Sequence, residues 1–140
     1  MEENYSFKKI FIRGIISGIV FTALWSTWAY YANLAHGAEL AKKASITQGS
    51  FTIINAFVYT ILVEYLFSIG KTKFVRIVLA FVLPNILVTI LLTSLHHLRG
   101  TPNVLATVTP SLTIIYALSL IYVLVIGPRK LKSGLDAAVS

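Results

Sequence analysis

The sequence has no cysteine, and only five of its 140 residues are acidic. The lack of cysteine excludes disulfides, thiolate nucleophiles and cysteine-based metal or iron–sulfur sites. The only aspartate, Asp136, stands in the C-terminal tail, so no Ser-His-Asp set can form within the apolar segments. The chain also has neither a phosphate-binding glycine loop nor a His-Glu-x-x-His motif. These absences favour a protein that is not an enzyme.

Long apolar runs occupy most of the chain and cover residues 10–34, 49–69, 74–95 and 104–126. About 20 apolar residues, at about 1.5 Å rise each, cross the roughly 30 Å hydrocarbon layer of a bilayer. A span must also satisfy its backbone hydrogen bonds internally. The sequence therefore predicts an all-α fold, a polytopic bundle of four transmembrane helices with short loops. Residues 1–140 are expected to form one integral membrane domain, with residues 127–140 as a cytoplasmic tail.

The Lys and Arg residues are divided unequally between the two sides of the predicted spans. Lys42, Lys43 and Arg99 lie on one side, and the other nine of the twelve lie on the opposite side. Because short loops rich in these residues stay in the cytoplasm, both termini are expected there, in a protein integral to a cytoplasmic (bacterial inner) membrane. The formal charge of +7 then reflects cations beside anionic headgroups, so no nucleic acid partner is expected. Aromatic residues at the outer end of the first span agree: Trp25, Trp28, Tyr30 and Tyr31.

Glu64 is an ionisable residue inside a predicted span, where a charge is costly and suggests a function. It lies six residues before Gly70, and Arg76 lies six residues after Gly70, so an antiparallel hairpin brings both to a similar depth. Arg13 of the first span lies near the same level. One interpretation is an intramembrane ion pair of Glu64 with Arg76 and Arg13 that joins helix ends. The other is a small channel or proton-coupled transporter in which Glu64 carries the proton or cation.

Polar residues also lie in the outer half of the predicted bundle. Asn85, Thr89 and His96 share one helix face, because they follow one another at intervals of four and seven residues. Pro84 beside them lacks the backbone N–H that would bond to Ala80, which predicts a kink. Two interpretations stay open: a cleft that binds a lipid or small solute, or a set of interhelical hydrogen bonds. The predicted cleft residues are Asn55, Asn85, Thr89, His96, Thr107 and Ser111.

All three histidines, His36, His96 and His97, fall at predicted outer helix ends. Imidazoles from two helices could hold a haem or a transition metal. Because His96 and His97 point about 100° apart, only one of them can face a partner shared with His36. They are therefore weak metal candidates, and no cofactor is expected. A lipid-modifying membrane enzyme that uses His96 or His97 as a base is a further alternative.

The predicted loops and the first span carry smaller signals. The first outer loop, residues 36–48, is expected to be either a short interfacial helix or an extension of the second span. In the second outer loop, Thr101 followed by Pro102 predicts a helix N-cap with proline at the first helical position. Small residues repeat every four positions on the first span and predict a face for close helix contact: Gly14, Gly18 and Thr22.

Together these features predict a small, non-enzymatic integral membrane protein that presents the polar cleft to a lipid or small solute. Its expected partners are membrane lipids, together with further copies of itself or other subunits of a membrane complex. The channel or transporter that uses Glu64 is the first alternative, and the lipid-modifying enzyme is the second.

Overall fold

The computed structural model describes the backbone of residues 2–129 and 132, and the side chains of residues 16, 18–129 and 132. Every element in this part of the chain is helical, as predicted. The α-helices are α1 (Glu2–Asn33), α2 (Ala38–Ile69), α3 (Lys73–Ile77), α4 (Leu83–Leu98) and α5 (Val104–Ile121). The other helical turns are η1 (Leu34–His36), η2 (Val78–Val82) and η3 (Tyr122–Ile126).

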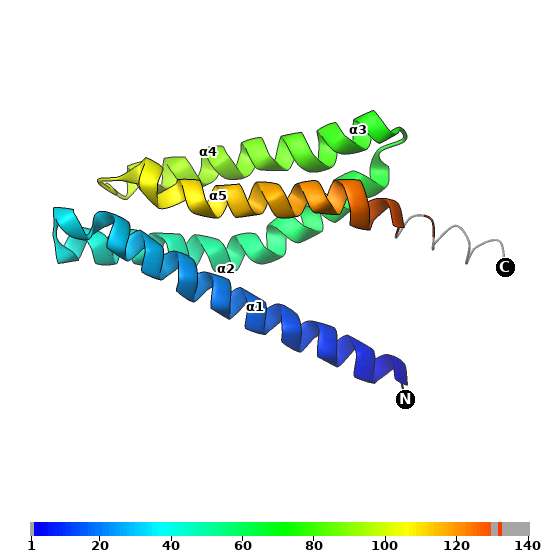
Figure 1. The fold of residues 1–140 in the computed structure, drawn as a ribbon, viewed down its shortest axis with the longest axis horizontal. Coiled ribbons are helices and arrows are strands. Elements are labelled where there is room, and N and C mark those ends of the chain that lie inside the picture. Colours follow the sequence, from blue (N-terminus) through cyan, green and yellow to red (C-terminus); the bar gives the residue numbers. More distant parts are fainter. Residues whose placement is uncertain (1, 130–131, 133–140) are drawn as a thin grey trace.

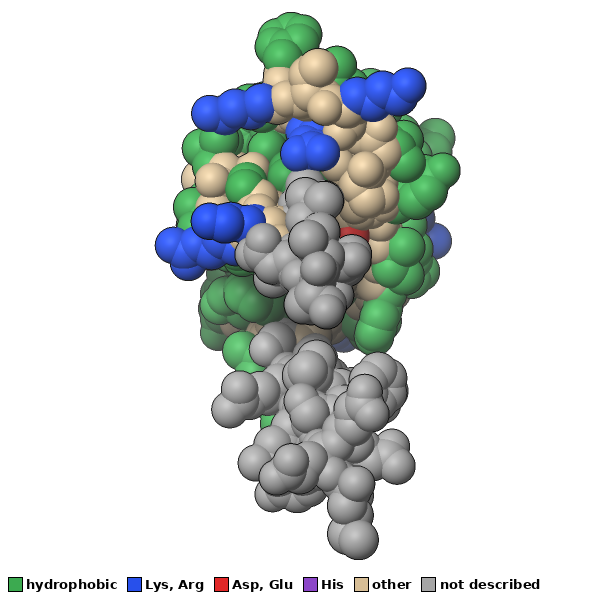
Figure 2. Space-filling view, turned by 90° about the vertical axis from the view of Figure 1, so that its right-hand side faces the viewer, with side chains coloured by type: hydrophobic (Ala, Val, Ile, Leu, Met, Phe, Trp, Pro, Cys, Tyr) green, Lys and Arg blue, Asp and Glu red, His purple; other side chains and the backbone are tan. Residues whose placement is uncertain are grey.

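Three helical stretches are long and apolar enough to cross a membrane: Ala38–Ile69, Lys73–Leu98 and Val104–Arg129. They match the second, third and fourth predicted spans and agree with a membrane-embedded protein. α1 is a further long helix, of 32 residues. Figure 1 shows the α1–α2 and α4–α5 turns at one end of the bundle, called here the α4–α5 end. The opposite end, called the α2–α3 end, holds the α2–α3 turn, and Lys and Arg side chains gather on this end of the molecule (Figure 2).

α2 begins well before its predicted boundary, at Ala38 rather than Gly49. Of the two expectations for residues 36–48, the extension of the second span is therefore the one observed. Gly37 makes the turn from η1 with a φ of 105°, a backbone conformation that side-chain-bearing residues rarely adopt. The added turns of α2 bury Ala41, Ala44 and Gln48. The extension is thus part of the packed bundle, because its buried face continues that of the helix.

The α4–α5 turn differs from its prediction. Thr101 does not cap α5, because the helix begins at Val104 and Asn103 is its N-cap. The Asn103 side chain accepts a hydrogen bond from the Ala106 backbone N–H at 3.3 Å. Thr101 is free for another role, since its buried hydroxyl lies 2.8 Å from the Nδ1 atom of His96.

The helix from Lys73 to Leu98 is distorted near Pro84, as the proline predicts. Five residues, Val78–Val82, form a π-helical turn directly before Leu83, whose backbone N–H donates to the carbonyl of Val78. Such a turn accommodates a residue that cannot donate an N–H to the helix. Asn85, the residue after the proline, uses its side-chain amide to bond the carbonyl of Phe81 at 2.8 Å.

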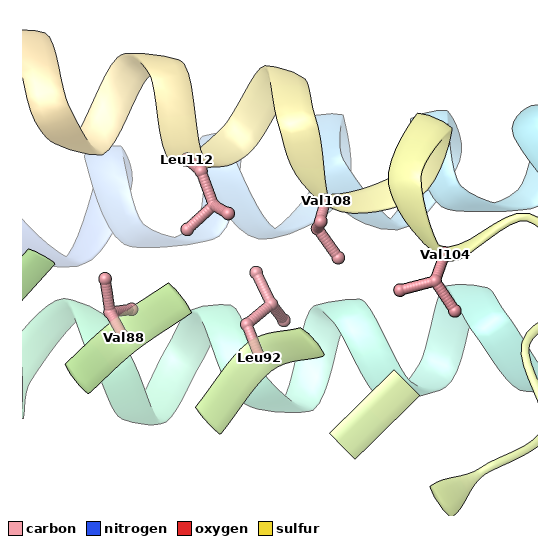
Figure 3. Close-up of a cluster of buried hydrophobic side chains, with 5 residues drawn as sticks. All are labelled: Val88, Leu92, Val104, Val108 and Leu112. Carbon is pink, nitrogen blue, oxygen red and sulfur yellow. The ribbon is translucent and has the colours of Figure 1, made fainter. Parts of the chain in front are cut away.

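Two buried apolar clusters hold α2 to α5 together. The larger one lies between α4 and α5 and contains Val88, Leu92, Val104, Val108 and Leu112, which point toward one another in Figure 3. The smaller one lies nearer the α2–α3 end and contains Val63, Phe67, Ala80 and Val123. α1 contributes to neither of these two sets of buried residues. The two apolar clusters therefore join α2 to α5, while α1 packs chiefly against α2.

α1 meets α2 at a small-residue contact. A Cβ atom added to Gly49 of α2 would lie 2.3 Å from the Oγ atom of Ser26 and 3.6 Å from Thr22 Cγ2. Gly18, two turns nearer the N-terminus, has no such neighbour within 4 Å. In Figure 1, α1 diverges from α5 in this N-terminal direction. Within the predicted small-residue face, Thr22 thus packs closely and Gly18 does not, while the side chain of position 14 lies outside the described part.

Candidate functional site

A hydrogen-bonded chain of buried side chains joins three helices near the α4–α5 end. His96 is fully buried, with Nδ1 2.8 Å from Thr101 Oγ1 and Nε2 2.9 Å from Gln48 Oε1. The Gln48 amide donates onward to Ser111 Oγ at 3.3 Å, and Ser111 donates to a carbonyl of its own helix. We call His96, Thr101, Gln48 and Ser111 the His96 network. Both ring nitrogens of His96 are thus used in connecting α4 to α2 and to the α4–α5 turn.

A second buried network fastens the end of α1 to the start of α5. Asn33 is fully buried, and its amide donates to Thr107 Oγ1 and to the carbonyl of Ala29, each at 2.8 Å. Its side-chain oxygen accepts from the backbone N–H of Asn103 at 2.9 Å. Thr107 in turn donates to the carbonyl of Asn103 at 2.6 Å. One side chain from α1 therefore fixes the first turn of α5.

Trp28 adds a further bond between these two helices, at a position set by a proline. Pro110 lies inside α5 and has no backbone N–H to donate to the carbonyl of Ala106, four residues before it. The Trp28 indole N–H donates to that carbonyl at 2.8 Å. A helix hydrogen bond lost to proline is thus replaced by one from a neighbouring helix, as membrane helices require.

Asn85 is the centre of a third network, midway along the bundle. Its side-chain oxygen accepts from the Tyr59 hydroxyl at 2.7 Å, and its amide donates to Ser119 Oγ at 2.9 Å. These contacts connect α4 to α2 and α5. One turn further along α4, the hydroxyls of Thr89 and Tyr116 form another interhelical hydrogen bond.

The six predicted cleft residues therefore fall into two groups, those that hydrogen bond between elements and those that line a cavity. Asn85, Thr89, His96, Thr107 and Ser111 all hydrogen bond to other helices or to the α4–α5 turn. Asn55 differs from them, since it has no hydrogen-bond partner within the described part of the chain. Asn55 and Ser111 line a cavity, and the other four do not. The predicted cleft is thus divided between interhelical contacts and a cavity wall.

The cavity lies between α1, α2 and α5 and has a volume of about 380 Å³. Along α2 its wall reaches from Gln48 to Glu64, a length of about 24 Å at the rise of an α-helix. At one end Gln48, Leu92 and Ser111 are almost fully buried, whereas at the other end Glu64 and Ile126 are exposed. The cavity is thus closed toward the α4–α5 end and open along the rest of its length, where the wall residues Phe21, Ile114 and Leu118 are exposed as well.

Most of the cavity wall is aliphatic or aromatic, with polar groups at intervals. α1 contributes Phe21 and Trp25, and α4 contributes Leu92. The remaining wall residues come from α2, α5 and η3. They are Gln48, Phe51, Thr52, Asn55, Ala56, Tyr59, Thr60, Val63, Glu64, Ser111, Ile114, Ile115, Leu118, Ser119, Tyr122 and Ile126.

The residues of the predicted intramembrane ion pair lie only partly within the described side chains. Arg76 donates to the carbonyl of Gly70 at 2.7 Å, and its guanidinium lies 5.5 Å from the centre of the Phe67 ring. Among the side chains that the structure describes, the one ion pair joins Lys42 to Glu39. Glu64 stands on the cavity wall. The side chain of Arg13 lies outside the described residues, so its place beside Glu64 stays a prediction.

The histidines take separate roles. Both nitrogens of His96 are held by the His96 network, while His36 and His97 are exposed. Among the described residues, no three His, Asp or Glu side chains are grouped as they would be to hold a metal ion. A metal ion or a substrate could reach a ring nitrogen of His96 only by displacing Thr101 or Gln48 from it.

Several of the residues that build these networks were not expected from the sequence: Trp28, Asn33, Gln48, Tyr116 and Ser119. Trp28 reads as an interfacial aromatic residue, and Gln48 falls at the last position of a predicted loop. The sequence nevertheless indicates a need for a donor such as Trp28, because Pro110 leaves the carbonyl of Ala106 without a partner in its own helix. Gln48 shares a face with Ala41 and Ala44 at helical spacing, which favours a buried side for this segment.

No protein family model, no curated protein and no solved structure matches this chain. Its function must therefore be inferred from its own residues and geometry.

Proposed function

We propose that the protein is a small lipid-binding protein of a cytoplasmic (bacterial inner) membrane, and that it is not an enzyme. All four long helices cross the bilayer in this proposal, with both termini in the cytoplasm. The support is the excess of Lys and Arg at the α2–α3 end, since positive loops stay on the cytoplasmic side. The apolar length of α1 supports the fourth span.

The observation that carries the proposal is the cavity between α1, α2 and α5. Its volume of about 380 Å³ falls within the roughly 300–1,000 Å³ of ligand sites. That volume extends over about 24 Å of helix, so the cavity is narrow for its length. A narrow, mostly apolar groove in a membrane-embedded bundle fits one hydrocarbon chain of a lipid better than it fits a ring system. The open end near Glu64 then lies where the chain would enter.

The lining residues favour binding over chemistry. The wall carries hydroxyl, amide and aromatic groups but no histidine, cysteine, lysine or arginine among the described residues. His96, the base considered for a lipid-modifying enzyme, is buried in its own network outside the cavity. General acid–base chemistry on a bound lipid needs a titratable group within reach of the reacting atoms. Glu64 at the open end is the single wall residue of that kind other than the two tyrosines.

The proposal can be tested with a substitution on the cavity wall that fills the cavity. Ala56→Trp places a large side chain in the groove, whereas the control Ala117→Trp adds the same side chain to an exposed position of α5 outside it. The protein is purified in mild detergent and examined by native mass spectrometry for bound lipid. It is also labelled with a photoreactive fatty acid in bilayer nanodiscs. We expect wild type and Ala117→Trp to retain lipid and to be labelled on α1, α2 or α5, and Ala56→Trp to lose both. Equal labelling of all three proteins would contradict the proposal.

The same spectra test a further part of the proposal, self-association or membership of a larger membrane complex. We expect the spectra to show the mass of a homo-oligomer with a defined number of subunits. Foreign subunits that co-purify would instead indicate an accessory role in a complex, and a bare monomer would contradict both.

A proton-coupled transporter or channel is the second candidate, because Glu64 lies on the wall of the same cavity. Reconstituted liposomes with an internal pH dye distinguish the two functions. If the protein is a transporter, wild type conducts protons or cations, and Glu64→Gln abolishes the flux while lipid retention is unchanged. If it is a lipid-binding protein, neither wild type nor Glu64→Gln produces a proton or cation flux above that of empty liposomes.

A further inference from the structure

The polar groups on the cavity wall differ in whether the protein itself satisfies them. The hydroxyls of Thr52, Thr60 and Tyr59 donate to Gln48 O, Ala56 O and Asn85 Oδ1, respectively. Gln48, Ser111 and Ser119 are also hydrogen bonded within the bundle. Asn55 is the one amide or hydroxyl on the wall with no partner in the described part of the chain. The Trp25 indole, which can donate but not accept, shares this state.

An amide without a partner is costly at this depth. Asn55 is half-buried and lies seven residues along α2 from Gln48, about 10 Å from the closed end of the cavity. Water does not reach hydrocarbon depth, so a polar group there normally finds a partner in the protein or in a ligand. All neighbouring wall hydroxyls already donate to other atoms. A bound ligand with a polar group can supply the hydrogen bond that Asn55 lacks.

We infer that the bound lipid chain carries an uncharged hydroxyl group that pairs with Asn55, an inference that rests on the proposed function. The amide offers both a donor and an acceptor, and a hydroxyl offers the same pair. The closed end accepts the tail of the chain, so the hydroxyl lies about 10 Å of chain from the tail end. A saturated chain without this group enters the same groove but leaves the amide unsatisfied. Asn55 is thus a specificity-determining residue of the cavity.

A matched pair of probes tests this inference on the full-length protein in nanodiscs. The probes are methyl stearate and its analogue with a mid-chain hydroxyl at the stated distance from the tail end. Each competes with the photoreactive fatty acid for labelling of the cavity. For wild type, we expect the hydroxylated ester to compete at a concentration about three- to tenfold lower than methyl stearate, as one hydrogen bond provides. For Asn55→Leu, we expect both esters to compete equally, at the concentration that wild type requires for methyl stearate.

Three other outcomes would overturn the inference. If wild type does not distinguish the two esters but binds both, the hydroxyl assignment is wrong while the proposed lipid-binding function stands. If Asn55→Leu keeps the preference, the hydroxyl is read by another residue. If neither ester competes with labelling of wild type, the inference and the proposed function fail together.

Two controls separate recognition from folding. Thr60→Val removes a wall hydroxyl that already donates within its own helix, so the preference for the hydroxylated ester should remain. Thermal unfolding of wild type and Asn55→Leu should agree closely, because Asn55 makes no hydrogen bond that the substitution could break. A loss of stability in Asn55→Leu as large as that of Asn85→Leu would show a structural role and contradict the inference. Asn85 is the matched amide, because it connects three helices.

Discussion

The two halves of α1 are held in different ways. Toward the α4–α5 end, Trp28 and Asn33 bond to three residues of α5 and its cap, and Ala29 is fully buried. Toward the N-terminus, a Cβ atom added to Gly18 would have no neighbour within 4 Å, and Phe21 and Trp25 face the cavity. In lipid, helices gain little from apolar burial against one another, so polar contacts decide where they join. The difference shows why a cavity exists beside one half of the helix and not the other.

The largest expected effect comes from breaking the His96 network. His96→Leu leaves the Gln48 side-chain oxygen and the Thr101 hydroxyl without their partner in a buried site. Each unsatisfied group costs about 1–3 kcal/mol, so the free energy of unfolding should fall by about 2–6 kcal/mol. Thermal unfolding in detergent measures the change. His97→Leu, at the adjacent exposed position, is the control and should leave stability nearly unchanged. A similar loss in both variants would contradict the role of the network.

The second prediction concerns the anchored half of α1. Asn33→Leu removes three hydrogen bonds and leaves the Asn103 backbone N–H without an acceptor. We expect a loss of about 2 kcal/mol in stability, within the range for an unsatisfied buried group. The distance between spin labels placed on α1 and α5 should also increase. Asn55→Leu is the matched control from the cavity wall, and it should change neither quantity.

A smaller effect is expected for the bond from Trp28 to the Ala106 carbonyl. Trp28→Phe keeps the aromatic ring but removes the donor, with a loss of about 1 kcal/mol expected for one interhelical hydrogen bond. Pro110→Ala restores a backbone N–H to the same carbonyl, so the loss from Trp28→Phe should be smaller in that background. A double-mutant cycle measures this coupling, and additive effects would mean that the proline does not set the bond. Trp25→Phe, whose indole has no partner in the described residues, should have less effect.

The smallest effect is expected at the open half of α1. Gly18→Ala places its methyl group in open space, so stability should change by less than about 0.5 kcal/mol. Gly127→Ala provides the contrast, because its Cβ would lie 2.6 Å from the Phe67 ring, and overpacking of this kind costs about 1–3 kcal/mol. If Gly18→Ala were the more harmful of the two, another helix must occupy the face of α1 that is open in the monomer.

The sequence predicts the helices well and the site only in part. Hydropathy finds the three helices that are long and apolar enough to cross a membrane, because crossing a bilayer needs length and apolar character. It misses the start of α2, since the Ala-Glu-Leu-Ala-Lys-Lys stretch of residues 38–43 favours a helix by propensity but is polar. Helical spacing also places Asn85, Thr89 and His96 together on one face. Spacing does not tell which helix that face meets, and so cannot separate hydrogen-bonded residues from a cavity wall.

The cavity cannot be predicted from local sequence patterns. It depends on the angle at which α1 leaves α5, which is fixed by contacts between residues some 70 to 80 positions apart, such as Asn33 with Thr107 and Trp28 with Ala106. The close approach of Gly49 to Ser26 also involves two distant segments. Asn55 and Asn85 have the same side chain in similarly apolar surroundings. Only the three-dimensional arrangement separates them, because it gives partners to one and a cavity to the other.

The indole bond at Pro110 has a mechanical consequence for α1. The Ala106 carbonyl is a single acceptor at a fixed height on α5, since the proline frees that carbonyl alone among its neighbours. Moving α1 along its axis by one residue would separate the indole from it, whereas turning α1 about this point keeps the bond. This bond therefore fixes the position of α1 along its own axis, and the half of the helix beside the cavity extends away from the bonds that Trp28 and Asn33 make.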